Sequence, residues 1–191
     1  MGNSYTTLWT NKLCRALQRE GHEGERLSLL FGGPHTSLPS FRSAGVQPGD
    51  RIFPIRLLRR KLYVLGALDV TRVMPYEDAG ALLDDDDYAK VVRWRVLKAG
   101  CVSEVVFGPP GTPLGFGTAI PGEALERLTY TSRRRGERTV KHVVDGELMH
   151  SISVHGVYRL AEASGRALDR LVREAAEPRA VGPRVPEARA A

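Results

Sequence analysis

The alternation of apolar and polar residues is clearest after Pro48-Gly49-Asp50, a turn signal in which Pro presets φ and Gly supplies a positive φ. Residues 51–56 then alternate as a strand does, and the basic connection Arg59-Arg60-Lys61 leads into an apolar run over residues 62–73. β-Branched and aromatic residues interrupted by Gly66 are typical of a buried strand that bends or bulges. The pattern predicts two central strands joined over a positively charged tip.

Shorter patterns on both sides of these strands predict the other elements. Alternating or continuous apolar runs indicate further strands over residues 5–11, 101–107, 139–144 and 148–160. Apolar residues at helical spacing indicate helices over residues 12–20, 88–97 and 161–176, and a short helix that begins at Pro121. We expect Asn11 and Asp87 to cap the first two helices and Asp145-Gly146 to turn a hairpin. Residues 88–97 also suit a strand, because Trp94 and its apolar neighbours alternate with arginines.

These elements predict the α+β class, built as a curved, mostly antiparallel β-barrel with flanking helices. The barrel strands are expected around Ile52, Val64, Val105, Val143 and Ile152, with the last helix closing one side. Residues 1–176 would form one domain. Residues 177–191 are rich in Pro, Arg and Ala without periodicity, and we expect them to be a disordered tail.

Composition narrows the class of protein. A hydrophobic fraction of 42% and a charged fraction of 26% are those of a soluble globular protein. No apolar run reaches the ~20 residues of a membrane helix, and no signal peptide is evident, so we expect a cytoplasmic protein without a membrane partner. Two cysteines do not make a disulfide framework, and each is expected to be a small buried hydrophobe. The abundance of Arg, Ala and Gly suggests a bacterial source.

The formal net charge of +6 favours a polyanionic partner, because phosphate contacts supply most of the non-specific affinity for nucleic acid. The cations also gather in three groups along the chain. These are Arg56, Arg59, Arg60 and Lys61, then Lys90, Arg93, Arg95 and Lys98, and finally Arg133, Arg134, Arg135, Arg138 and Lys141. The alternative is that GC-rich coding inflates the arginine content and that these are ordinary solvated loops.

Three segments together resemble the PUA-like superfamily, which includes the EVE, YTH and ASCH domains. They are an opening strand that ends in a polar residue, the turn and strands GVQPGDRIFPI and LYVLGALDVTRV, and a late hairpin running into GVYRLAEASGRALDRLV. Together they span about two thirds of the chain. The resemblance implies a small, strongly curved barrel with a cleft on one side, in which members often bind RNA or a modified, flipped-out base.

The chain also departs from these relatives. The early Lys- and Glu-bearing motif of ASCH-type hydrolases is absent from residues 21–30, and a YTH-type aromatic cage has no residue-by-residue counterpart. Residues 83–121 are longer than the corresponding connection of a minimal EVE domain.

A base-binding pocket needs an aromatic stacking surface, polar groups for the base edge and nearby cations. Trp9 and Trp94 are the candidate stacking residues, and Tyr5, Thr10 and Asn11 lie beside the first of them. The alternative for Trp9 is an ordinary core or rim position, and the apolar neighbours of Trp94 favour a core position more strongly. The predicted basic rim consists of Arg59, Arg60 and Lys61 together with Arg133, Arg134 and Arg135. The predicted partner is nucleic acid, either RNA or single-stranded or modified DNA.

The motifs of common enzymes do not appear. The five histidines lack metal-ligand spacing, and no Gly-x-Ser-x-Gly elbow is present, so we assign no catalytic residue, cofactor or metal.

Two alternatives to a binding module remain open. One is a small hydrolase of RNA or a nucleoside, using a carboxylate such as Glu104 with a nearby Lys, Cys or His. The other is a protein-interaction domain. Two or more buried acids or bases converging in one cleft would favour the hydrolase.

Overall fold

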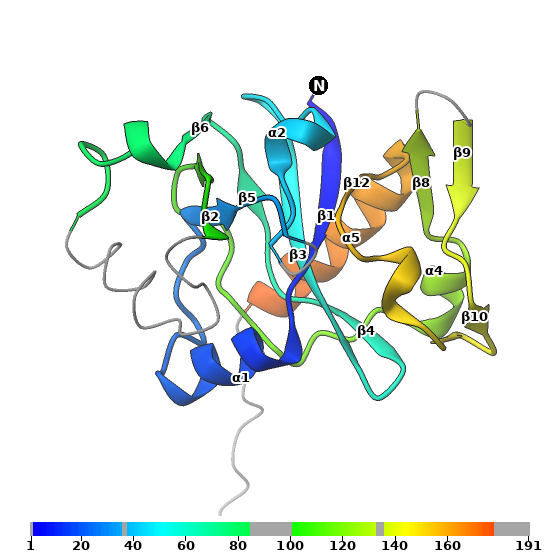
Figure 1. Cartoon of the computed structure of the whole chain (residues 1–191). Coiled ribbons are helices and arrows are strands. Elements are labelled where there is room, and N and C mark those ends of the chain that lie inside the picture. Colours follow the sequence, from blue (N-terminus) through cyan, green and yellow to red (C-terminus); the bar gives the residue numbers. More distant parts are fainter. Residues whose placement is uncertain (1, 36–37, 85–100, 133–135, 178–191) are drawn as a thin grey trace, which may run out of the picture.

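The computed structural model describes residues 2–35, 38–84, 101–132 and 136–177. This part of the chain is a mixed α+β fold with several sheets and four α-helices (Figure 1). Several sequence predictions fall outside the described residues. They are the cap at Asp87, the element over residues 88–97 with Trp94, the basic residues Arg133, Arg134 and Arg135, and the tail beyond Glu177.

The largest sheet has the order β12 (Val157–Arg159), β1 (Ser4–Leu8), β3 (Arg51–Leu58) and β4 (Lys61–Val64), with β5 (Leu68–Asp69) also paired to β3. β1 and β3 run parallel, and the other named strand pairs of the fold are antiparallel. The mostly antiparallel pairing is therefore confirmed. β1 ends at Leu8, which is earlier than the predicted end at residue 11.

The predicted hairpin with a basic tip is confirmed. β3 and β4 pair from Ile55–Val64 to Leu58–Lys61 across a two-residue turn. Arg59 and Arg60 occupy this turn with φ angles of 49° and 64°, the positive values that a tight hairpin turn requires. The apolar run after the tip is not one strand, however. It divides at Gly66 into β4, β5 and β6 (Arg72–Pro75), because the backbone leaves the ladder at residues 65–67.

A second sheet has the order β2 (Leu29–Gly32), β7 (Glu104–Phe107) and β6, and two short hairpins complete the strands. The hairpins are β8 (Thr129–Ser132) with β9 (Gly136–Thr139), and β10 (Val143–Val144) with β11 (Glu147–Leu148).

The strand predicted around Ile152 is wrong. This residue lies in a 3₁₀ turn over Ser151–Ser153, and its side chain is 70% exposed. The local alternation of apolar and polar residues resembled a strand, but no neighbouring strand pairs with this segment among the described residues. β12 begins only at Val157.

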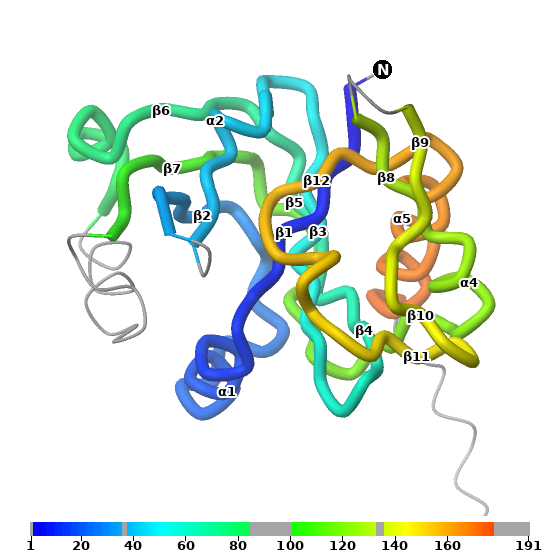
Figure 2. The backbone as a smooth tube through the Cα atoms, turned by 45° about the vertical axis from the view of Figure 1, so that its right-hand side comes forward, coloured from blue at the N-terminus to red at the C-terminus, as the bar shows by residue number. Residues whose placement is uncertain are grey.

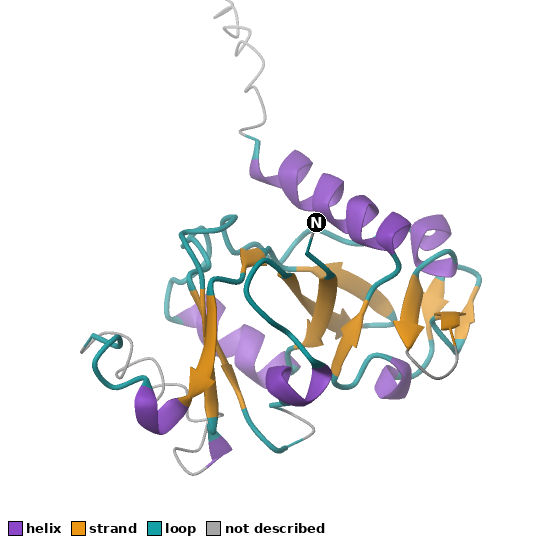
Figure 3. Cartoon of the chain, turned by 90° about the horizontal axis from the view of Figure 1, so that it is seen from above, coloured by secondary structure: helices purple, strands orange, loops and turns teal. Residues whose placement is uncertain are grey.

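The four helices are α1 (Asn11–Arg19), α2 (Phe41–Ala44), α4 (Gly122–Glu126) and α5 (Glu162–Ala176). α1 and α5 are amphipathic, and each buries one apolar side against the sheets (Figure 3). The cap of α1 is Thr10, not Asn11. The hydroxyl of Thr10 accepts a hydrogen bond from Leu13 N at 3.2 Å, and its extended backbone is that of a capping residue. Likewise, Pro121 precedes α4 instead of beginning it.

Two hydrophobic clusters lie on opposite faces of β3. Ile52 belongs to the first cluster, with Leu13 and Leu17 of α1 and the second sheet. Phe53 and Ile55 belong to the other, with Leu168 and Val172 of α5. Successive strand side chains point to opposite faces, which explains how one strand contributes to both clusters. β3 therefore joins the two halves of the molecule (Figure 2).

The strands around the second cluster form a curved, open arrangement. An isolated bridge between Tyr130 and Leu160 links β8 to the end of β12. At the other side, Leu148 N donates a hydrogen bond to Arg60 O at 2.8 Å, which links β11 to the basic tip. The β8–β9 and β10–β11 hairpins nevertheless remain separate sheets.

Candidate functional site

The predicted ligand residues at the end of β1 have structural partners. Tyr5 is 3% exposed within the first core, and its hydroxyl donates to Gly45 O at 3.3 Å. Thr10 caps α1. Asn11 is half-buried and uses both ends of its amide. Its Nδ2 donates to Leu57 O at 2.9 Å, and its Oδ1 accepts from Arg56 Nε at 2.7 Å. The bonds of Asn11 tie α1 to β3, and each of the three residues has a structural role in the fold.

Trp9 lies beside a small cavity. It is half-buried against the first core and lines the cavity with Leu17, Leu27, Leu29 and Leu114. His22, Glu25, Arg26 and Ser28 supply the polar part of the wall. The cavity volume is about 50 Å³, which is room for roughly three or four water molecules. A nucleobase would fit only if these side chains moved apart.

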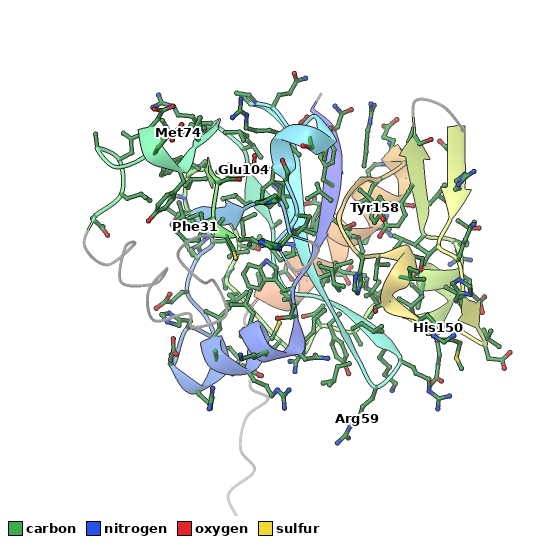
Figure 4. All side chains as sticks on the ribbon, in the orientation of Figure 1. Phe31, Arg59, Met74, Glu104, His150 and Tyr158 are labelled. Carbon is green, nitrogen blue, oxygen red and sulfur yellow. The ribbon has the colours of Figure 1, made fainter. Side chains whose placement is uncertain are left out.

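The basic tip is exposed, as its sequence predicts. Arg59 projects away from the body of the protein at the end of the β3–β4 hairpin, and Lys61 is exposed beside it (Figure 4). Arg60 instead forms an ion pair with Glu147 of β11, with 3.1 Å between Nε and Oε2. Two of the three predicted cations of the tip thus face solvent without a carboxylate partner among the described residues.

Three further cations, which the sequence analysis did not single out, extend the basic tip. Lys12, Arg15 and Arg19 are exposed on α1. With Gln18 they line a surface cavity of about 350 Å³ that has no acidic side chain in its described wall. Their spacing of three and four residues puts them on one helical face. This spacing is the feature of the sequence from which the three cations could be identified. Lys12, Arg15, Arg19, Arg59 and Lys61 are called the basic face below.

The basic face occupies one end of the molecule. The bond from Asn11 Nδ2 to Leu57 O holds the start of α1 against the end of β3, two residues before the hairpin tip begins at Arg59. Figures 1 and 2 show α1 and the tip projecting from the same end. Exposed cations from two separate elements therefore lie at the same end of the molecule, which is an arrangement that suits an extended polyanion.

A larger cavity, of about 800 Å³, lies at the opposite end of the molecule, next to α2 and the ends of β6 and β7. Its wall includes Glu104, which is 3% exposed (Figure 4). The carboxylate of Glu104 accepts hydrogen bonds from Phe41 N, from Arg42 N at 3.4 Å and from Ser40 Oγ at 3.2 Å. Glu104 thus anchors the start of α2, and no other buried acid or base shares this cavity among the described residues.

Elsewhere among the described residues, charged side chains meet at Arg51, which forms ion pairs with Asp69 and Asp169 beside a surface cavity of about 510 Å³. His22 lies 2.9 Å from Glu25, and the ring of His142 packs against that of His150. Within the described ranges, no group of three or more His, Cys, Asp or Glu side chains could hold a metal ion. In the same ranges, no helix combines the length and apolar character needed to span a membrane.

The thiol of Cys14 is expected to be unreactive toward alkylating reagents in the folded protein. Burial raises the pKa of its thiol to about 12, although the positive charge of Arg56 opposes this effect. At pH 8 only about one molecule in 10⁴ would carry the reactive thiolate. Iodoacetamide at pH 8 should therefore label the half-buried Cys101 alone, and both cysteines only in denaturant. Mass spectrometry counts the labels. Two labels on the native protein would contradict the burial of Cys14.

The comparisons with known proteins add no family. No protein-family model matches the chain, and a search of curated proteins gives no match either.

Proposed function

We propose that this protein binds nucleic acid through its basic face, with the phosphate backbone as the main contact. The observation that carries the proposal is the convergence of exposed cations from α1 and the β3–β4 tip on one end of the molecule. None of these five side chains has an ion-pair partner among the described residues. Unpaired surface cations attract phosphates and release counterions when they bind.

The proposed scaffold is a PUA-like barrel. Its support is the curved arrangement of strands around the second core, together with the Tyr130–Leu160 bridge and the Leu148–Arg60 hydrogen bond. The Tyr130–Leu160 bridge connects the β8–β9 hairpin to the large sheet, and the Leu148–Arg60 hydrogen bond connects the β10–β11 hairpin to it. In this proposal the basic tip and α1 form the rim of the barrel.

The proposed ligand is RNA or single-stranded DNA. A flexible strand can follow both α1 and the tip, and it can present an unstacked base to Trp9. The small size of the cavity beside Trp9 supports a backbone-dominated contact, in which a modified or flipped base adds affinity only after the cavity widens. Neither a hydrolase nor a protein-interaction domain has a specific observation in its favour, since Glu104 is already bonded to α2.

The test is a titration of the full chain against single-stranded RNA, single-stranded DNA and duplex DNA at several salt concentrations. Each phosphate contact changes the slope of log K against log salt by about −0.7 for a single strand, so five cations predict a slope of about −3.5. Filter binding or fluorescence anisotropy measures the affinity. Failure to bind any of the three more tightly than about 10⁻⁴ M at low salt would refute the proposal.

A further inference from the structure

Arg56 is a buried charge without a carboxylate partner. It is 5% exposed on β3, and no ion pair reaches it within the described part of the chain. Its partners are instead two neutral amides of α1. Arg56 Nε donates to Asn11 Oδ1 at 2.7 Å, and Nη1 makes a long hydrogen bond of 3.5 Å to Gln18 Oε1. Burying a charge is costly unless its donors are satisfied, so this arrangement needs an explanation.

The chemistry of arginine fixes the direction of both amides. A guanidinium group has five N–H donors and no acceptor, so it can only face the oxygen of an amide. Gln18 therefore turns its Oε1 inward to Arg56 and its NH₂ group outward. Gln18 is exposed and lines the 350 Å³ cavity with Lys12, Arg15 and Arg19. The result is an amide donor among three cations.

The two arginines of this cavity are also held in place. Arg15 Nε donates to Asn11 O at 3.2 Å, and Arg19 Nε donates to Arg15 O at 3.3 Å. These bonds lay each side chain along the helix and leave the terminal N–H groups of the guanidinium available. All four side chains of the described wall thus offer donors.

We propose that this cavity on α1 is a binding site for a single phosphate group, called the seat below. Gln18 is a neutral hydrogen-bond donor in this site, and Arg56 is the positioning residue that orients the Gln18 amide. The proposal deepens the proposed function, because a backbone phosphate is one source of this chemistry. A free polyphosphate is the other source. The seat does not depend on which of the two supplies the phosphate.

The decisive variant is Gln18→Glu. A glutamate has the same shape, and it gives Arg56 the carboxylate that it lacks, so the melting temperature should stay the same or rise. The same carboxylate places a negative charge in the seat and removes the amide donor. We expect the Kd for inorganic tripolyphosphate, measured by calorimetry, to rise at least about tenfold. An unchanged affinity would mean that the phosphate does not bind in this cavity, and it would overturn the proposal.

Gln47→Glu is the matched control. Gln47 is exposed beside the turn before β3, and the substitution changes the net charge by the same amount. It should leave the tripolyphosphate affinity within about twofold of the wild type, because exposed charges farther apart than a Debye length are screened. Equal weakening by the two variants would overturn the seat, since the effect would then follow net charge alone.

Arg56→Lys tests the positioning role. Lysine keeps the charge but cannot face two amides with a planar fork. We expect the Kd to rise about fivefold with an unchanged salt dependence, because Arg56 itself touches no phosphate. A lower melting temperature with an unchanged Kd would assign Arg56 to the fold alone and overturn its positioning role.

Parallel titrations with tripolyphosphate and with a single-stranded oligonucleotide separate the two proposals. If only tripolyphosphate binds, and Gln18→Glu weakens it, the seat stands and nucleic-acid binding is refuted. If the oligonucleotide binds and Gln18→Glu weakens it, both proposals stand, with a backbone phosphate as the source. If Gln18→Glu has no effect on the binding of either ligand, the seat is refuted, and nucleic-acid binding stands where the oligonucleotide binds. If neither ligand binds, both proposals are refuted.

Discussion

A variant with glutamine in place of Lys12, Arg15 and Arg19 should bind a single-stranded oligonucleotide about a hundredfold more weakly than the wild type at ~0.1 M salt. The three side chains are exposed and lie outside the packed core, so the fold should survive their loss. Each lost phosphate contact removes about 0.7 from the magnitude of the salt slope. Three lost contacts therefore lower the slope by about 2, and at ~0.1 M salt this amounts to roughly a factor of 100.

The matched control for this variant lies on α5. Arg166, Arg170 and Arg173 are also exposed on one helix, and their replacement by glutamine removes the same net charge. Two of them already pair with acids of their own helix, Arg166 with Glu162 and Arg173 with Asp169. The control should therefore lose only a few-fold in affinity and keep most of the salt slope. An equal loss in both triple variants would show that binding follows net charge and not the basic face.

The sequence predictions that the structure confirms rest on residues that lie close together in the sequence. Asp145-Gly146 turns a hairpin with φ angles of 50° and 72°, as the dipeptide predicts. α1 and α5 follow from apolar residues at helical spacing, and α5 ends at Ala176 as expected. In each case the residues that decide the conformation lie within a few positions of one another.

Long-range contacts explain the predictions that failed. The alternation around Ile152 lacked a partner strand, which no local pattern can supply. Asn11 has a structural role because Arg56, 45 positions away, bonds to its side chain. The size of the cavity at Trp9 depends on leucines from three separate segments. Such packing cannot be recognised in a single sequence, whereas the spacing of the cations on α1 is a local sequence pattern.

Glu104 should be required for stability and not for binding. Glu104→Ala leaves the N–H groups of Phe41 and Arg42 and the hydroxyl of Ser40 without their acceptor. The hydrogen bond from Phe41 N is buried. Unsatisfied buried donors cost about 1–3 kcal/mol each, so we expect a loss of about 3 kcal/mol in the free energy of unfolding. For a chain of this size the melting temperature should fall by about 10 °C. Differential scanning calorimetry or circular dichroism measures the shift.

Glu77→Ala provides the comparison, because Glu77 lines the same 800 Å³ cavity but is exposed. Its loss should change the melting temperature by less than about 2 °C, since exposed substitutions rarely alter stability by more than about 0.5 kcal/mol. Glu104→Gln should fall between the two variants, because its amide oxygen can replace only one oxygen of the carboxylate as an acceptor. A melting temperature of Glu104→Ala close to that of the wild type would mean that water satisfies the donors of α2. The hydrogen bonds to the buried carboxylate would then not be required for the fold, and the hydrolase alternative would gain the support that it now lacks.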